Sequence, residues 1–133
     1  MDRLFQQLGF DLVREKIASY ALTENARLSA KNCPSFLPHK QYPNEQEKLL
    51  EMRDLLLLDT APPLSAFPSQ EAVIKKARVR GSLLTEEELL TLAGILQSAR
   101  QSAAYFRQRL DKCPRLARIA EQYDPGLEKL ERE

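Results

Sequence analysis

Glycine is scarce in this sequence. Only four of its 133 residues are glycine, namely Gly9, Gly81, Gly94 and Gly126, and the closest pair lies 13 residues apart. Sheets with tight hairpins need turn residues of positive φ, so the shortage favours helices. It also excludes a P-loop and a dinucleotide-binding fingerprint, because both need closely spaced glycines. The composition therefore predicts a helical protein with no nucleotide site in this chain.

Residues that bind metals or act as nucleophiles are equally few. The chain has one histidine, His39, and two cysteines, Cys33 and Cys113. A zinc site needs four ligands, usually in tight pairs, and a catalytic triad needs a histidine beside its nucleophile. We expect His39 to lie in an exposed loop. We assign no catalytic, metal or cofactor-binding residue, and we interpret the acidic run at 86–88 as a partner of a helix dipole.

An excess of charge of one sign is absent, since 20 Lys and Arg face 19 Asp and Glu. This balance excludes a strongly basic nucleic-acid module at the level of the whole chain. No apolar run is long enough to span a membrane, and the first residues lack the regions of a signal peptide. Two cysteines are too few for a disulfide framework. We expect a cytoplasmic protein that is not an enzyme and has no membrane partner.

Apolar residues make up 43% of the chain, and their spacing predicts an all-α helical bundle of five to seven helices. The expected helices before residue 80 cover 3–21 with a break at Gly9, 24–31 with Thr23 as N-cap, 45–58 with Asn44 as N-cap, and 70–78 with Ser69 as N-cap. Prolines predict a loop over 34–43. The third helix should bury Leu49, Met52 and Leu56 and cover its leucine-rich end, 55–58, on several sides, and the fourth should turn Val73 and Ala77 inward.

The strongest pattern begins at Thr85, which with Glu88 forms a capping box. Apolar residues then recur at steps of three and four, at Leu89, Leu92, Leu96, Ala99, Ala103, Phe106 and Leu110. This seam predicts one long helix near 85–112, running from 86 to about 111. A seam of this kind forms an intramolecular core more often than a dimer zipper. Two shorter helices should follow, one starting at Pro114 and one after Asp124.

The densest basic cluster consists of Lys75, Lys76, Arg78 and Arg80. Four positive charges in six residues could contact phosphates, so these residues are the candidate nucleic-acid-binding site. The alternative, which we favour, is a solvated helix end whose cations complement the dipole. A second basic set, formed by Arg100, Arg107 and Arg109, has the same two interpretations. We interpret Tyr105 and Tyr123 as packing residues.

Short stretches along the chain resemble one known family. They are Leu8-Gly9-Phe10-Asp11, Ile17-Ala18-Ser19-Tyr20-Ala21, Thr23-Glu24, Asn32-Cys33-Pro34-Ser35, Pro63-Leu64, Ile74-Lys75-Lys76-Ala77 and the run from Arg80 to Leu90. In this order they are similar to the opening of MutS proteins of the second type, which lack the mismatch-reading domain. The resemblance covers about residues 8–110 and consists of helix-boundary patterns.

The resemblance implies that the chain is one helical domain, 1–133, at the N-terminal part of a longer MutS-like protein. It implies paired short helices over 1–33, the loop over 34–43, a helical core over 44–111 and the start of further helices over 112–133. The longer protein is expected to be an ATPase, and members of this family often carry a small nuclease domain as well. Its ATP and Mg belong to a domain beyond Glu133, so this chain itself has no cofactor.

The function implied is a non-catalytic helical core or lever segment that couples a distant ATPase dimer to DNA, in repair or recombination control. Expected partners are DNA through the longer protein, the other domains of that protein, and a second copy of the chain. The alternative is a self-standing helical module for protein interaction or dimerisation, with no role on DNA.

Overall fold

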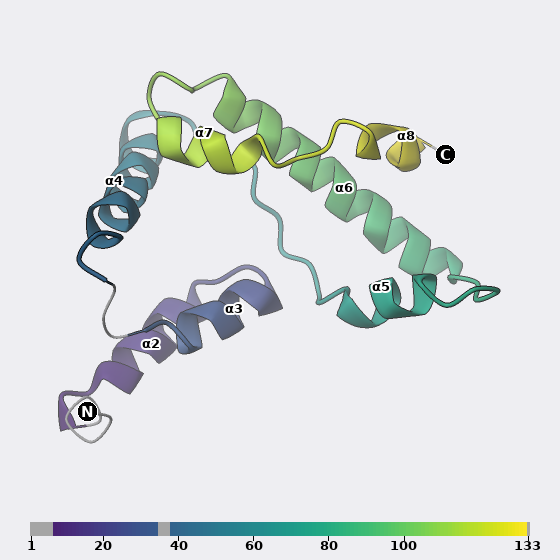
Figure 1. Ribbon diagram of the computed structural model, residues 1–133, viewed down its shortest axis with the longest axis horizontal. Coiled ribbons are helices and arrows are strands. Elements are labelled where there is room, and N and C mark those ends of the chain that lie inside the picture. The colour runs from purple at the N-terminus through teal and green to yellow at the C-terminus, as the bar shows by residue number, and fades with distance from the viewer. Residues whose placement is uncertain (1–6, 35–37, 133) are drawn as a thin grey trace.

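The computed structural model describes residues 7–34 and 38–132. Within these ranges the chain forms seven helices and no strand, which confirms the all-α prediction. The helices are α2 (Phe10–Ser19), α3 (Glu24–Lys31), α4 (Tyr42–Leu58), α5 (Glu71–Ala77), α6 (Glu86–Arg107), α7 (Pro114–Ala120) and α8 (Leu127–Arg132). Figure 1 shows α6 as the axis of the molecule, with α5 at its N-terminal end, α4 and α7 near its C-terminal end, and α8 beside it.

Helices α2 and α3 form a hairpin. Gly9 precedes α2 with a φ of 69°, a left-handed conformation that glycine adopts without strain, so the predicted break is confirmed; the predicted start of this pattern at residue 3 lies outside the described residues. Ala18 is buried between the two helices, and an ion pair of 3.1 Å joins Lys31 to Glu15. Thr23 accepts a hydrogen bond of 3.2 Å from the backbone N–H of Ala26, as its predicted role as N-cap requires.

Helix α4 begins earlier than the sequence indicated. It starts at Tyr42, with Gln41 as N-cap, so the predicted start at 45 and the predicted cap by Asn44 are wrong. The proline that we expected to end the loop, Pro43, lies inside the first turn of the helix. A first-turn N–H has no partner within the helix, so a proline there removes no hydrogen bond.

The buried face of α4 is also different from the predicted one. Glu51 and Leu55 are buried, whereas Leu49 and Leu56 are exposed. The leucine-rich end is not covered on several sides, because Leu57 and Leu58 are 72% and 83% exposed. The helix is rotated toward its polar contacts with α7 rather than toward its most apolar side.

The core of the described residues is small and lies where α4, α6 and α7 meet. Its buried apolar side chains are Leu55, Ala103, Tyr105, Cys113 and Ala117. Leu55, Tyr105 and Cys113 form one cluster, against which Phe106 and Leu116 pack. The T-shaped contact of the Tyr105 and Phe106 rings, with centroids 5.2 Å apart, stiffens this end of α6.

Helix α7 depends on α4 for its N-cap. Its first residue is Pro114, and Cys113 before it offers no side-chain cap. The Glu51 carboxylate supplies the acceptor instead: it receives the backbone N–H of Arg115 at 3.1 and 3.2 Å and that of Leu116 at 3.0 Å. A buried carboxylate therefore satisfies the free donors of a helix that begins more than sixty residues later.

The long helix α6 is present where it was predicted, with the capping box of Thr85 and Glu88 formed in both directions. It ends at Arg107, earlier than the predicted 111, because the chain turns through 108–112 to bring Cys113 into the core. The predicted seam is only partly buried. Ala103 is enclosed, whereas Leu89, Ala99 and Leu110 are exposed.

The short helix α5 begins at Glu71 with Gln70 as N-cap, so the prediction that Ser69 caps it is wrong. The Gln70 side chain turns back and donates to the carbonyl of Pro68 at 3.1 Å, which sets the start of the helix. Val73 is half-buried as expected, but Ala77 is exposed. Gly81 has the predicted left-handed conformation, with a φ of 84°.

Replacing Glu51 tests the cap of α7. Glu51→Ala should lower the free energy of unfolding by about 1–3 kcal/mol, because two partly buried N–H groups lose their acceptor. Glu47→Ala is the control, since Glu47 is 51% exposed and makes only an ion pair of 3.6 Å with Arg115. Its cost should stay below about 1 kcal/mol. Urea denaturation followed by circular dichroism measures both, and equal effects would contradict the assigned cap.

Two glycines should respond to alanine in opposite directions. A Cβ at Gly94, inside α6, would meet no atom within 4 Å, so Gly94→Ala should stabilise the chain by up to about 1 kcal/mol. Gly81→Ala should destabilise it, because alanine is strained at a φ of 84°. The midpoints of thermal unfolding report the two signs, and a loss of stability in Gly94→Ala would show that the space beside it is filled.

Candidate nucleic-acid interface

The predicted basic cluster lies at the C-terminal end of α5 and in the turn that leads to α6. Lys75 pairs with Glu71 one helical turn away at 2.9 Å, and both side chains are exposed. Arg78 and Arg80 are exposed and make no ion pair with any described residue. The cluster therefore offers two unpaired guanidinium groups and one exposed lysine that is already partly neutralised.

The fourth member, Lys76, holds two helices together. Its Nζ lies 2.7 Å from Glu88 Oε2, the same oxygen that accepts the backbone N–H of Thr85 at 2.7 Å. The ammonium of Lys76, and after it the N–H of Thr85, hold the pKa of Glu88 below its usual value. Lys76 thus connects α5 to the capping box of α6, and its charge is engaged inside the molecule.

The second basic set connects α6 to its neighbours. Arg100 donates two hydrogen bonds to Glu131 of α8, at 2.8 and 2.9 Å, and Glu131 raises the pKa of this arginine. Arg107 reaches the carbonyls of Ala120 and Tyr123 at 3.4 Å. Arg109 pairs with an aspartate that follows α4. These three arginines make contacts with neighbouring parts of the chain, which neither of the two interpretations from the sequence included.

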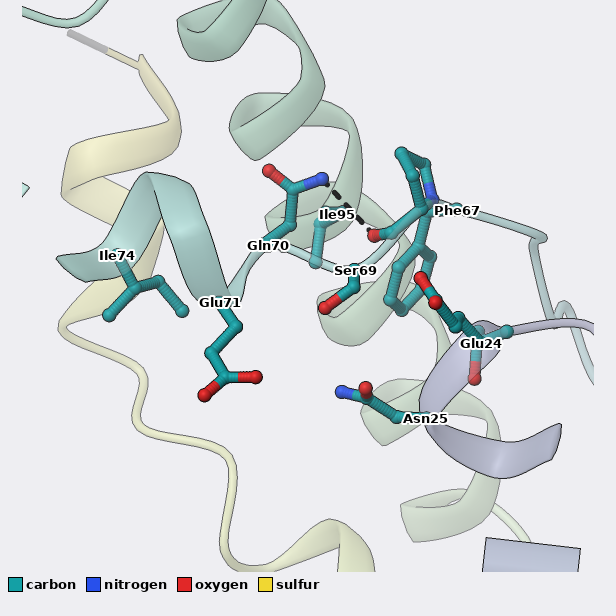
Figure 2. A pocket seen from close by; sticks show the side chains of 10 residues that line it. Glu24, Asn25, Phe67, Ser69, Gln70, Glu71, Ile74 and Ile95 are labelled. Carbon is teal, nitrogen blue, oxygen red and sulfur yellow. Dashed lines mark hydrogen bonds between the residues drawn. The ribbon is translucent and has the colours of Figure 1, made fainter. Parts of the chain in front are cut away.

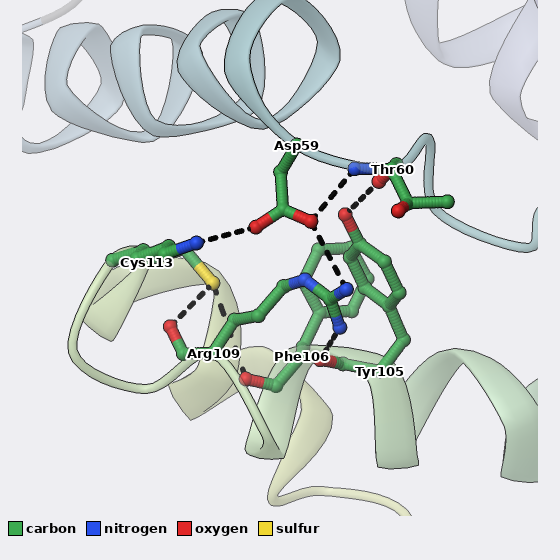
Figure 3. Close-up of polar contacts among 7 residues, drawn as sticks. Asp59, Thr60, Tyr105, Phe106, Arg109 and Cys113 are labelled. Carbon is green, nitrogen blue, oxygen red and sulfur yellow. Dashed lines mark hydrogen bonds and ion pairs between the residues drawn. The ribbon is translucent and has the colours of Figure 1, made fainter.

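Asp59, just after α4, is the centre of a polar network (Figure 3). One carboxylate oxygen accepts Arg109 at 3.1 Å and the N–H of Thr60 at 2.7 Å, and the other accepts Lys112 at 2.6 Å. Lys112, Arg109 and Thr60, in this order of effect, hold the pKa of Asp59 far below its ordinary value. The carboxylate stays ionised and fully engaged, which suits a structural contact and leaves it no role as an acid or base.

The same network contains one thiol and one phenol. The Tyr105 hydroxyl donates to the carbonyl of Thr60, and the guanidinium of Arg109 lies 3.9 Å from the centre of the Tyr105 ring. Cys113 is fully buried and donates to the carbonyl of Arg109 at 3.1 Å. Burial raises the pKa of the Cys113 thiol, so it remains protonated and unreactive.

A pocket with a volume of about 360 Å³ lies between the start of α3 and the start of α5, and its lining combines polar side chains with Phe67 and Ile95. Figure 2 shows Asn25 and Glu24 facing Ser69 and Glu71 across it, with Ile95 of α6 behind. Two carboxylates at its mouth disfavour phosphate, so this pocket adds nothing to a nucleic-acid interface. Among the residues that the structure describes, no group of His, Cys, Asp and Glu could hold a metal ion, and no helix is long and apolar enough to cross a membrane.

Sequence reasoning missed the ion pairs that organise the helices. Glu51 and Leu55 share one face of α4 at a step of four, and this spacing was readable, but an acidic residue on a helix face does not suggest burial. The partners of Asp59 lie 50 and 53 residues away, at Arg109 and Lys112. No local pattern indicates such a pair.

Comparison with known proteins gives one significant match among curated proteins. A protein of Clostridium beijerinckii named endonuclease MutS2 is 26% identical over 121 residues. The match covers 90% of this chain and 15% of that protein, so the chain spans a small part of the length of its relative. No protein-family model matches the chain, and no solved structure matches it significantly. The similarity supports a distant relation to the MutS family and nothing finer.

The pH dependence of stability should reveal Asp59. Its folded pKa is depressed, so its contribution is complete above the pKa of an unfolded aspartate, about 3.9, and is lost as the pH falls below that value. The free energy of unfolding should therefore fall less steeply between about pH 5 and pH 2 in Asp59→Asn than in the unmodified chain. Asp54→Asn is the control, because Asp54 pairs only with its neighbour Arg53. Parallel curves for all three proteins would contradict the assignment.

Proposed function

We propose that this chain is a non-catalytic helical core and lever segment of a MutS-like ATPase, and that it couples a distant ATPase dimer to DNA. The observation that carries the proposal is the similarity of 90% of the chain to one part of a much longer protein named endonuclease MutS2. The ATP, Mg and any nuclease chemistry belong to other parts of that longer protein. DNA and a second copy are partners of the whole assembly.

The bracing of α6 supports a mechanical role. This helix has 22 residues and is about 33 Å long. Lys76 with Glu88 holds its N-terminal end, Arg100 with Glu131 holds its C-terminal half, and Asp59 holds the turn after it. A stiff element with defined contacts along its length can transmit a displacement from one end to the other.

A second candidate is a self-standing helical module that binds other proteins. The feature that favours it is the large number of exposed apolar side chains, including Leu12, Leu49, Leu57, Leu58 and Leu83. Exposed apolar surface of this kind marks an interaction surface, whether within one polypeptide or between two.

The coding sequence after the codon for Glu133 separates the two candidates. A reading frame that continues into a P-loop ATPase domain is the expected result, and a stop codon directly after Glu133 would contradict the lever proposal. In the longer protein, Arg100→Ala should reduce the stimulation of ATP hydrolysis by DNA and leave the basal rate unchanged. Arg132→Ala is the control, because its side chain is 77% exposed and pairs only within α8. If DNA stimulated ATP hydrolysis equally in the two variants, the contact of α6 with α8 would have no part in the coupling.

Weak DNA binding by the chain itself should depend on two arginines. Because Lys76 and Lys75 are paired, Arg78 and Arg80 are the available phosphate contacts, and neutralising two phosphates gives a log–log salt slope of about −1.8. Replacing both by alanine should flatten this slope in fluorescence anisotropy titrations. Arg27→Ala with Arg118→Ala removes the same charge from exposed positions elsewhere and should leave most of the slope. If both pairs act alike, the cluster is an ordinary solvated face.

A further inference from the structure

The surface of α6 lacks charge over three turns. No residue between Glu88 and Arg100 is charged, although Leu89, Leu90, Gly94, Gln97 and Ala99 in this stretch are exposed. A helix that faces water normally carries charged residues on its outer side. This part of α6 has the composition of a helix covered on more than one side.

A groove of about 520 Å³ runs along the same stretch. One wall is α6, through Ile95, Ser98, Ala99 and Ser102, which follow one another at helical spacing. The opposite walls are the turn between α2 and α3, from Tyr20 to Thr23, together with Ala26 of α3, and the connector from Leu64 to Phe67. Small side chains on α6 and larger apolar ones at the rim make a channel into which the ridge of another helix fits.

One residue beside the groove has no explanation within the described part of the chain. Gly94 lies in the interior of α6, where glycine is unfavourable relative to alanine. A Cβ at this position would meet nothing within 4 Å. With Ser98 and Ser102 it forms a small residue at every fourth position, the pattern that lets a second helix backbone approach closely.

The exposed area shows how much surface is left to cover. The chain exposes 10536 Å². A compact monomer of 15.2 kDa exposes about 7,100 Å². The excess of about 3,400 Å² is several times the roughly 800 Å² that one partner buries in a standard protein interface. A single contact with a second copy of the chain leaves most of this excess in water.

From these observations we infer that the groove along α6 is the seat of an apolar α-helix supplied by another part of the same, longer polypeptide. The inference rests on the proposed function, because the similar protein is much longer than the part that this chain matches. A surface of this extent needs several contacts, and the remaining length of a longer polypeptide can supply several, whereas a second copy supplies one. The absence of charge along the groove favours an apolar ridge over a basic or acidic peptide.

Thiol labelling tests the seat directly. In a Cys33→Ser background the remaining native thiol, Cys113, is fully buried. Ala99→Cys places a thiol in the groove, and Ala104→Cys places one at an exposed position on another side of α6. In the longer polypeptide, a maleimide reagent should modify position 99 at least about tenfold more slowly than position 104, with both rates referred to those in denaturant. In the 133-residue chain the two rates should be similar.

Each other outcome overturns the inference in a distinguishable way. Equal rates in the longer polypeptide, with ATP hydrolysis still stimulated by DNA, would leave the proposed function standing and the groove open. Protection at position 99 in the 133-residue chain that rises with concentration, together with a dimer in sedimentation that Ala99→Glu disperses and Ala104→Glu does not, would assign the groove to a second copy. A reading frame that ends after Glu133 would remove both the occupant and the lever proposal.

Discussion

The fold depends most on one carboxylate, that of Asp59. It holds Arg109 and Lys112 in the turn after α6, and so fixes the point where the long helix stops and the chain reverses. The reversal places Cys113 in the core and Pro114 at the start of α7, within reach of Glu51. Helices α4, α6 and α7 therefore meet through charged and polar contacts around a core of few apolar side chains. These polar contacts fix the relative positions of the three helices, as close packing in a larger hydrophobic core does in a compact domain of the same size.

The large exposed apolar surface and the small core have the same cause, which is the open arrangement of the helices. The chain has enough apolar residues for a larger core, but its helices spread along α6 rather than closing over one centre, as Figure 1 shows. Exposed leucines on α4 and the uncharged stretch of α6 are then surfaces of the kind found inside larger proteins. The likeness of the chain to 15% of a longer relative agrees with this picture.

What could be predicted from the sequence was local. The capping box at Thr85, the N-cap at Thr23 and the left-handed Gly81 depend on neighbouring residues, and all three are present. What could not be predicted depends on distant partners. Leu55 is buried and Leu56 is exposed because α4 turns Glu51 toward α7. The charge of Lys76 is paired with Glu88 and so is not available in the basic cluster. The four candidate residues lie close together, as expected, but their free charge is about half of what the sequence indicates.

Because the N-cap of α7 is the Glu51 side chain of α4, the order in which these helices fold is constrained. A helix of seven residues is too short to be stable alone, and the acceptor for its first N–H groups is Glu51, more than sixty residues earlier. The hairpin of α2 and α3 joins residues close in sequence, such as Glu15 and Lys31, and can form without waiting for the rest. Contacts that close long loops form slowly. The hairpin, whose contacts are local in sequence, should therefore form early. Helix α7 should form late, when α4 packs against it and brings Glu51 to its N-terminus.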